Sequence, residues 1–154
     1  GGNRKKDYLL KHILSIRART WTEQVEAPFK INDLTSRKVG ILIIDTLTDN
    51  FVYEFQTGKY IQDRQIALAR HLHELAMIAI EKEIAVVVTN TVRNRMPEDE
   101  NTYVTETGGN TVSQGVHIRL RLVRVDKGWS AQLNNDEKSI RFKIGKRGLM
   151  DWEG

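Results

Sequence analysis

Two short hydrophobic runs and one long periodic segment dominate the pattern of apolar and polar positions. The runs, residues 39–44 and 84–89, are rich in β-branched side chains, which is typical of strands buried on both faces in a parallel sheet. Between them, over residues 61–83, apolar side chains recur at helical spacing. A strand, a helix and a second strand in this order predict a right-handed βαβ unit, with helices packed on a parallel sheet. The predicted fold class is therefore α/β.

The flanking segments predict further elements. Residues 7–19 carry an apolar stripe with spacings of one, three and four, which indicates a short helix. Residues 93–111 are polar and too long for an ordinary connection, so we expect a functional or mobile loop there. Three strand-like stretches follow, divided by turn-forming residues at 126–128 and 134–136, and they predict an antiparallel meander at the edge of the sheet. The stretches are residues 117–125, 129–133 and 139–144.

Composition narrows the class of protein. The 154 residues, 40% of them hydrophobic, suffice for one core, and no linker or repeat divides them, so we expect a single domain over residues 1–154. A chain without cysteine fits a reducing, intracellular compartment. Apolar runs of about five residues are far shorter than the roughly 20 that span a bilayer, which predicts no membrane association. A net charge of +4 permits nucleic-acid binding without requiring it.

Polar residues follow both predicted strands directly. Asp45 ends the first run, and Thr89, Asn90 and Thr91 end the second. Ligands of open α/β sheets bind outside the carboxyl ends of the strands, so we expect the site there. A carboxylate in this place can hold Mg²⁺, usually through water, in enzymes that hydrolyse nucleotides. The competing interpretation is an aspartate that only caps the following turn, and the motif alone does not separate the two.

Several segments, in the same order along the chain, resemble the RecA/RadA recombinase family, most closely its archaeal and eukaryotic branch. Ile41-Leu42-Ile43-Ile44-Asp45-Thr46 resembles the Walker B strand, with Asp45 in the metal-binding position, and Ile84 to Asn90 resembles the strand whose end senses the nucleotide. The resemblance implies a RecA-like P-loop ATPase core with a mainly parallel sheet, helices on both faces and the antiparallel meander at its C-terminal end. It also implies ATP and Mg²⁺ as cofactors, with Asp45 as the catalytic residue that holds Mg²⁺ through water.

Two further segments resemble the DNA-binding loops of this family. Residues 51–65 resemble the first loop and the start of the helix behind it, and residues 93–107 resemble the second loop, which Gly108-Gly109-Asn110 closes. The resemblance implies single- and double-stranded DNA as partners, and self-association into a filament or ring. Aromatic and cationic side chains suit base stacking and phosphate contact, while packing under a loop is the competing interpretation. The DNA-binding candidates are Phe51, Tyr53, Lys59, Arg64, Arg93, Arg95, Gly108, Gly109 and Asn110.

The chain departs from the family's pattern at the nucleotide site. It contains no Gly-x-x-x-x-Gly-Lys-Ser/Thr sequence, the phosphate-binding loop, so we expect an incomplete core that is not active alone. By resemblance, residue 1 falls after that loop. Thr91 stands where the family has a glutamine that reports on the γ-phosphate, and Gln114 stands where a polar group faces the neighbouring subunit's nucleotide. The nucleotide-sensing candidates are Asn90, Thr91 and Gln114.

Three functions are open at this point. The first is a RadA-like recombinase that carries out ATP-dependent strand exchange on single-stranded DNA in repair and recombination. The second is a non-catalytic DNA-binding paralogue or mediator. It is favoured by Thr91, by the missing loop and by Val52, which stands where the resemblance implies an arginine in the first DNA-binding loop. The third and weakest is a RecA-fold signalling ATPase of the clock-protein type, which uses no DNA loops. DNA binding that is indifferent to ATP would indicate the second, and DNA-independent hexamers the third.

Overall fold

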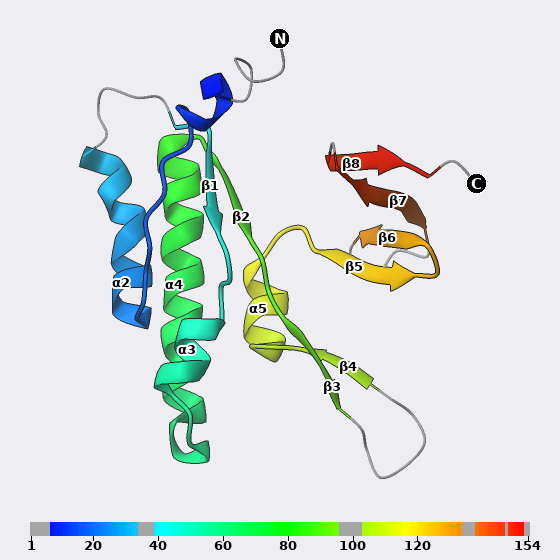
Figure 1. Cartoon of the computed structure of the whole chain (residues 1–154). Helices are drawn as coiled ribbons and strands as arrows, with labels where there is room; N and C mark the ends of the chain where they lie inside the picture. Colours follow the sequence, from blue (N-terminus) through cyan, green and yellow to red (C-terminus); the bar gives the residue numbers. More distant parts are fainter. Residues whose placement is uncertain (1–6, 34–38, 96–102, 134–137, 147, 153–154) are drawn as a thin grey trace. The chain divides into compact units, whose positions relative to one another are not determined.

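The computed structural model describes residues 7–33, 39–95, 103–133, 138–146 and 148–152, and within these only the backbone of residues 31–33, 93–95 and 103–105. The chain forms two compact units, residues 1–109 and 110–154. The first contains α2 (Trp21–Glu26), η1 (Ala27–Asp33), β1 (Ile41–Ile44), α3 (Asp49–Glu54), η2 (Gly58–Tyr60), α4 (Ile61–Lys82), β2 (Ala85–Val88), β3 (Val92–Arg95) and β4 (Tyr103–Glu106) (Figure 1). Helix α5 (Gly109–Gly115) begins at the boundary, and β5 (Leu120–Val125), β6 (Gly128–Leu133), β7 (Ser139–Gly145) and β8 (Gly148–Asp151) follow. A single domain over residues 1–154 stays a prediction.

The predicted βαβ unit is present in the first unit. Strands β1 and β2 pair in parallel, and α4 connects them and lies along them (Figure 1). Helix α4 ends at Glu83, whose backbone is left-handed, with φ 52°, and whose N–H bonds the carbonyls of Ala79 and Ile80. That N–H satisfies carbonyls which the helix end would otherwise leave unpaired. The mixed α/β class is thereby confirmed.

The parallel sheet is smaller and more open than expected. Side chains alternate along both strands, with Leu42 and Ile44 half-buried, while Ile41, Ile43 and Val87 are exposed. In the described part of the chain, the expectation of strands buried on both faces is therefore not met, and neither is that of a mainly parallel sheet, because β1–β2 is its one parallel pair. Apolar residues on both sides of a strand allow helices to pack on both faces of a sheet. In the described part of the chain, only one face of β1–β2 is partly covered.

The core of the first unit is formed mainly by α4, together with α3 and the residues next to the strands. Helix α4 buries one stripe of side chains at spacings of one and three, and α3 contributes Phe51. The Phe51 ring lies between Trp21, at a centroid distance of 6.0 Å, and His71, at 5.7 Å. The buried apolar side chains of this unit are Leu47, Phe51, Leu68, Leu72, Leu75, Ile78 and Ile84. This packing fixes the loop between β1 and α3, on which the candidate site depends.

Three segments differ from the sequence-based expectation. Residues 7–19 are helical only at 7–10, a turn follows at 11–12, and residues 13–19 have no helix or strand. Residues 51–60 form α3 and η2 where a DNA-binding loop was expected, and the helix start expected behind that loop is the start of α4. Residues 92–95 and 103–106 pair as the antiparallel hairpin β3–β4, with Val92 opposite Glu106, inside the segment expected to be a loop. Hydrogen bonding across the hairpin satisfies the backbone of a polar segment that lacked strand-like alternation.

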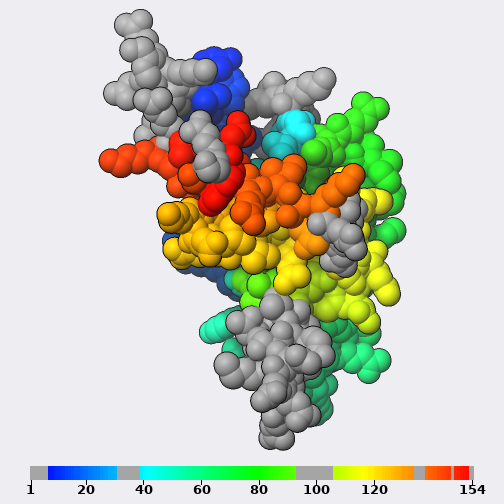
Figure 2. Space-filling model, turned by 90° about the vertical axis from the view of Figure 1, so that its right-hand side faces the viewer, coloured from blue at the N-terminus to red at the C-terminus, as the bar shows by residue number. Residues whose placement is uncertain are grey.

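The second unit contains the predicted meander, but as a sheet of its own. Among the described residues none of its strands pairs with β1 or β2, so the expected place at the edge of the parallel sheet is not met. Strands β5 to β8 form a four-stranded antiparallel sheet in sequential order, so three strands were predicted and β8 was missed. The register places Leu122, Ala131 and Ile140 on one face and Val123, Ser130 and Arg141 on the other. Much of the side-chain surface of these strands is exposed, and Figure 2 shows them in yellow to red. The turn predicted at 134–136 lies outside the described residues.

Candidate nucleotide and DNA site

Asp45 stands at the carboxyl end of β1, and the structure brings it to the end of β2 as predicted. Its Oδ1 accepts a hydrogen bond from Thr89 Oγ1 at 2.5 Å. Two backbone hydrogen bonds continue the strand pairing past the sheet, from the Thr89 N–H to the Ile44 carbonyl and from the Leu47 N–H to the Thr89 carbonyl. The peptide bond between Asp45 and Thr46 is cis. The hydrogen bonds of Thr89 hold the Asp45 carboxylate in a defined place at the strand ends, and its side chain remains exposed.

The described oxygen ligands around Asp45 suit a Mg²⁺ ion that keeps its water shell, and they are too few to enclose a metal with protein ligands alone. No described residue donates a hydrogen bond to its second carboxylate oxygen, and this side chain is exposed to water. Among the described residues, no group of three or more His, Cys, Asp or Glu side chains is arranged to hold a metal. A single carboxylate with a neighbouring hydroxyl suits a cation that keeps most of its water shell, as Mg²⁺ does. Asp45 and Thr89 are the residues that could contact such a hydrated ion.

Asn90 joins three segments of the first unit. Its Oδ1 accepts from Thr48 Oγ1 at 2.7 Å and from the Thr91 N–H at 3.0 Å, and its Nδ2 donates to the Thr107 carbonyl at 2.7 Å. The Thr91 hydroxyl lies 3.1 Å from the Thr107 hydroxyl. Asn90 and Thr91 therefore face the base of the β3–β4 hairpin through these bonds. We call Thr48, Asn90, Thr91 and Thr107 the Asn90 network.

The residues expected to contact DNA around α3 and α4 fall into two groups. Phe51 is fully buried in the core, so no base can stack on its ring in this structure. Tyr53 is 74% exposed, and Lys59 Nζ lies 5.9 Å from the centre of the Tyr60 ring. Arg64 is half-buried in the first turns of α4. Tyr53, Lys59 and Arg64 keep their predicted role as candidates, on ordered helical backbone.

The remaining candidates lie in the hairpin and in α5. Arg93 and Arg95 belong to β3, opposite Thr105 and Tyr103, and their side chains are outside the described residues. Gly108 and Gly109 have positive φ angles of 88° and 52°, a backbone conformation that glycine adopts most readily. The Asn110 carbonyl accepts a hydrogen bond from the Ser113 hydroxyl within α5. Gln114 is exposed on the same helix in the second unit, and its role stays a prediction.

Four polar residues that matter here were missed at the sequence level. Gln24 is buried on α2, donates from Nε2 to the Leu47 carbonyl at 2.8 Å and accepts from Asn50 Nδ2 at 2.9 Å. Thr48 and Thr107 complete the Asn90 network. His71 is buried beside Phe51, and burial lowers its pKa from 6.5 to about 4, against a smaller opposing effect of Glu74. A threonine three residues after Asp45 was a usable signal, whereas the other three residues carry no pattern of their own.

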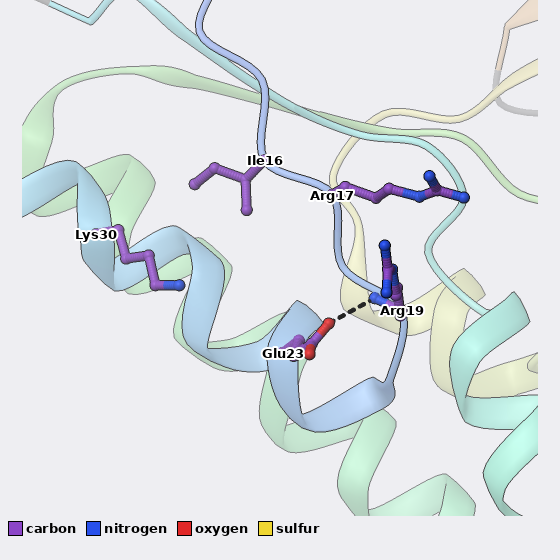
Figure 3. Close-up of a pocket in the computed structure, with 5 residues that line it drawn as sticks. All are labelled: Ile16, Arg17, Arg19, Glu23 and Lys30. Carbon is purple, nitrogen blue, oxygen red and sulfur yellow. Dashed lines mark hydrogen bonds between the residues drawn. The ribbon is translucent and has the colours of Figure 1, made fainter.

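A shallow depression on the first unit contains none of the predicted site residues (Figure 3). It is lined by Ile16, Arg17, Arg19, Glu23 and Lys30. Glu23 takes part in hydrogen bonds at the start of α2. Its Oε2 accepts from the Arg19 N–H at 2.7 Å, and its own N–H donates to Thr20 Oγ1. Three cations around one engaged carboxylate make this surface basic.

None of the described helices is both long and apolar enough to cross a membrane.

Two comparisons with known proteins bear on the family of this chain. The family model described as Rad51 matches residues 3–152. A relative from Metallosphaera sedula, called DNA repair and recombination protein RadA, is 26% identical over 152 residues, which are 94% of this chain and 47% of that protein. The chain therefore spans about half the length of this curated relative. Because the family model covers nearly the whole sequence, this chain belongs to the Rad51 family.

Proposed function

We propose that this chain binds single-stranded DNA in recombination and repair, as part of a RadA-like strand-exchange activity that uses ATP and Mg²⁺. The observation that carries the proposal is the set of exposed aromatic and cationic side chains on α3 and η2, ahead of α4. Tyr53 and Tyr60 are 74% and 44% exposed, and Lys59 lies beside the Tyr60 ring. Aromatic faces next to cations suit base stacking and phosphate contact, and each stacked base contributes roughly 1–3 kcal/mol.

Asp45 supports the part of the proposal that concerns Mg²⁺. Its exposed carboxylate oxygen is open to a hydrated ion, and such an ion supplies positive charge against the phosphates of ATP. No phosphate-binding loop occurs in this sequence. We therefore assign hydrolysis and strand exchange to an assembly in which a chain with such a loop takes part. Self-association into a filament or ring on single- or double-stranded DNA belongs to the same proposal.

A second candidate function is that of a non-catalytic DNA-binding paralogue or mediator. Thr91, which stands where the resemblance places the γ-phosphate sensor, shares a hydrogen bond with the Thr107 hydroxyl. Its side chain is thus directed at the hairpin base. This candidate predicts DNA binding that is indifferent to ATP.

The proposal is tested by fluorescence anisotropy with labelled single-stranded DNA over a salt series, with and without ATP and Mg²⁺. Lys59→Ala is expected to weaken binding and to reduce the slope against the logarithm of salt concentration by about one, since one phosphate contact is lost. Lys82→Ala removes an exposed cation at the other end of α4 and serves as the control. Equal effects of the two variants would refute the assigned surface, and no binding at low salt would refute DNA binding itself.

A further inference from the structure

We propose that Asn90 is a positioning residue. Through hydrogen bonds on both of its sides, it holds the base of the β3–β4 hairpin against the loop that follows Asp45, so that no bound nucleotide is needed to place the hairpin. The consequence for DNA binding rests on the function proposed above, because the hairpin carries Arg93 and Arg95. The statement about position concerns the protein alone and can be tested without DNA.

The loop side of the Asn90 network is anchored in the core. Thr48 and Leu47 are fully buried, and the Leu47 N–H bonds the Thr89 carbonyl at 2.9 Å. On the other side of the loop, Gln24 donates to the Leu47 carbonyl. Buried hydrogen bonds of this kind are costly to leave unmade, because the abandoned groups have no water to replace the partner. Thr48 Oγ1 therefore offers Asn90 a fixed point.

The hairpin side is held at the residue that follows β4. Asn90 Nδ2 donates to the Thr107 carbonyl at 2.7 Å, and the Thr107 N–H donates to the Thr91 carbonyl at 2.9 Å. The two threonine hydroxyls add a third bond at 3.1 Å. Two of these three bonds come from side chains, so the hairpin base is fastened by more than strand pairing. Asn90 is the one residue of the Asn90 network bonded to all three others.

The hydrogen-bonding capacity of Asn90 is almost exhausted by these contacts. An amide oxygen has two acceptor positions, and both are used, by Thr48 Oγ1 and by the Thr91 N–H. The opposite amide orientation would set an NH₂ group against the Thr91 N–H, so the contacts also fix which way the side chain faces. A ligand shifts a conformation only through a difference in affinity between two states. Because these hydrogen bonds already fix the position of the hairpin base, we expect a bound nucleotide to change that position little.

Hydrogen exchange at the Thr107 amide measures this position directly. Thr48→Val removes only the hydroxyl that anchors Asn90, on the side away from the hairpin, and Thr48→Ser keeps it. We expect Thr48→Val and Asn90→Ala to raise exchange at the Thr107 amide by about tenfold, and Thr48→Ser to leave it within about twofold of wild type. The Ile84 amide, which bonds the Ala79 carbonyl, is the internal control. If Asn90→Ala does not fold, the Thr48 pair still decides the outcome.

Unchanged Thr107 exchange in Thr48→Val would overturn the positioning role, as would an equal rise at Ile84, which would indicate general destabilisation. ATP and Mg²⁺ are expected to leave wild-type Thr107 exchange unchanged, and a rise in its protection on their addition would overturn independence from nucleotide. In the anisotropy assay, we expect affinity for single-stranded DNA to fall in Thr48→Val and not in Thr48→Ser. If Thr107 exchange rises while affinity for single-stranded DNA stays unchanged, the proposed effect of Asn90 on DNA binding would be refuted. Loosening in a protein that binds no DNA at any salt would support the positioning role and refute the proposed function.

Discussion

His71 makes the stability of the first unit depend on pH in a specific window. The side chain is 1% exposed, its ring packs on Phe51, and neither ring nitrogen has a hydrogen-bond partner among the described residues. Burial without a partner penalises the imidazolium, which lowers the pKa of His71 to about 4, while nearby Glu74 opposes this in part. Glu74 is itself paired with Arg70, whose Nε lies 2.9 Å from Glu74 Oε1. The folded protein therefore keeps His71 neutral where the unfolded chain is protonated.

The size of the effect follows from the two pKa values. Above pH 6.5 the histidine is neutral in both states and contributes no pH dependence. As the pH falls below 6.5, the unfolded chain binds a proton that the folded state excludes, so the free energy of unfolding decreases until about pH 4. The difference between 6.5 and about 4 corresponds to about 3 kcal/mol. That is a large fraction of the stability of an ordinary domain, which is about 5–15 kcal/mol.

Urea unfolding at a series of pH values between 7 and 4 tests this reasoning. His71→Leu replaces the imidazole by an apolar side chain, so the variant is expected to lose about 3 kcal/mol less than wild type over that range. His73→Leu, two positions away and exposed, controls for the removal of a histidine from the same helix. Carboxylates that titrate in the same range act in all three proteins and cancel in the comparison. If His71→Leu and wild type lose equal stability, His71 is not the group responsible.

Three further predictions test other parts of the structure in the same unfolding assay. Phe51→Ala is expected to cost about 3–5 kcal/mol, and Tyr53→Ala, exposed on the same helix, under about 0.5 kcal/mol, so equal costs would contradict the division of α3 into a buried and an open side. Glu83→Gly removes a side chain from a left-handed position and is expected to raise the free energy of unfolding by about 1 kcal/mol, whereas a decrease would argue against the φ of 52°. Thr20→Ala removes the acceptor for the Glu23 N–H and is expected to cost about 1 kcal/mol, while Thr20→Ser should retain most of it, and equal losses would exclude the cap.

The parts of the fold set by local patterns were predictable from the sequence. The helix at 61–82 and the strands on either side of it appear where periodicity placed them, and the resemblance to the recombinase family is confirmed by the match over residues 3–152. Parallel pairing of strands that run into Asp45 and Thr89 then brings those two side chains together, as expected from their shared place after a strand. The positions of the helix and strands, and the place of Asp45 and Thr89 directly after a strand, depend on neighbouring residues in the sequence.

Features that depend on distant partners were not predictable. Phe51 looked like a loop aromatic, and only the approach of Trp21 and His71 shows that it belongs to the core. Thr107 joins Asn90 because the hairpin returns to the end of β2, a closure that a polar segment without strand-like alternation does not reveal. The exposed face of β1–β2 was unpredictable for a similar reason. Whether a strand is buried on its second face depends on elements distant in sequence that pack on it, and the strand's own residues do not specify these.

The positions of the three tryptophans give each unit its own optical signal. Trp21 packs against the Phe51 and Phe55 rings in the first unit, at 6.0 and 5.7 Å. In the second unit, Trp152 has the Lys143 ammonium 4.8 Å and the Arg141 guanidinium 5.9 Å from its ring, and Trp129 lies in β6 opposite Phe142. Replacing Trp21 by phenylalanine would leave a chain whose indole emission arises from residues 129 and 152 alone. Its melting curve, set beside that of the unaltered protein, would show whether residues 1–109 and 110–154 unfold in one cooperative step or in two.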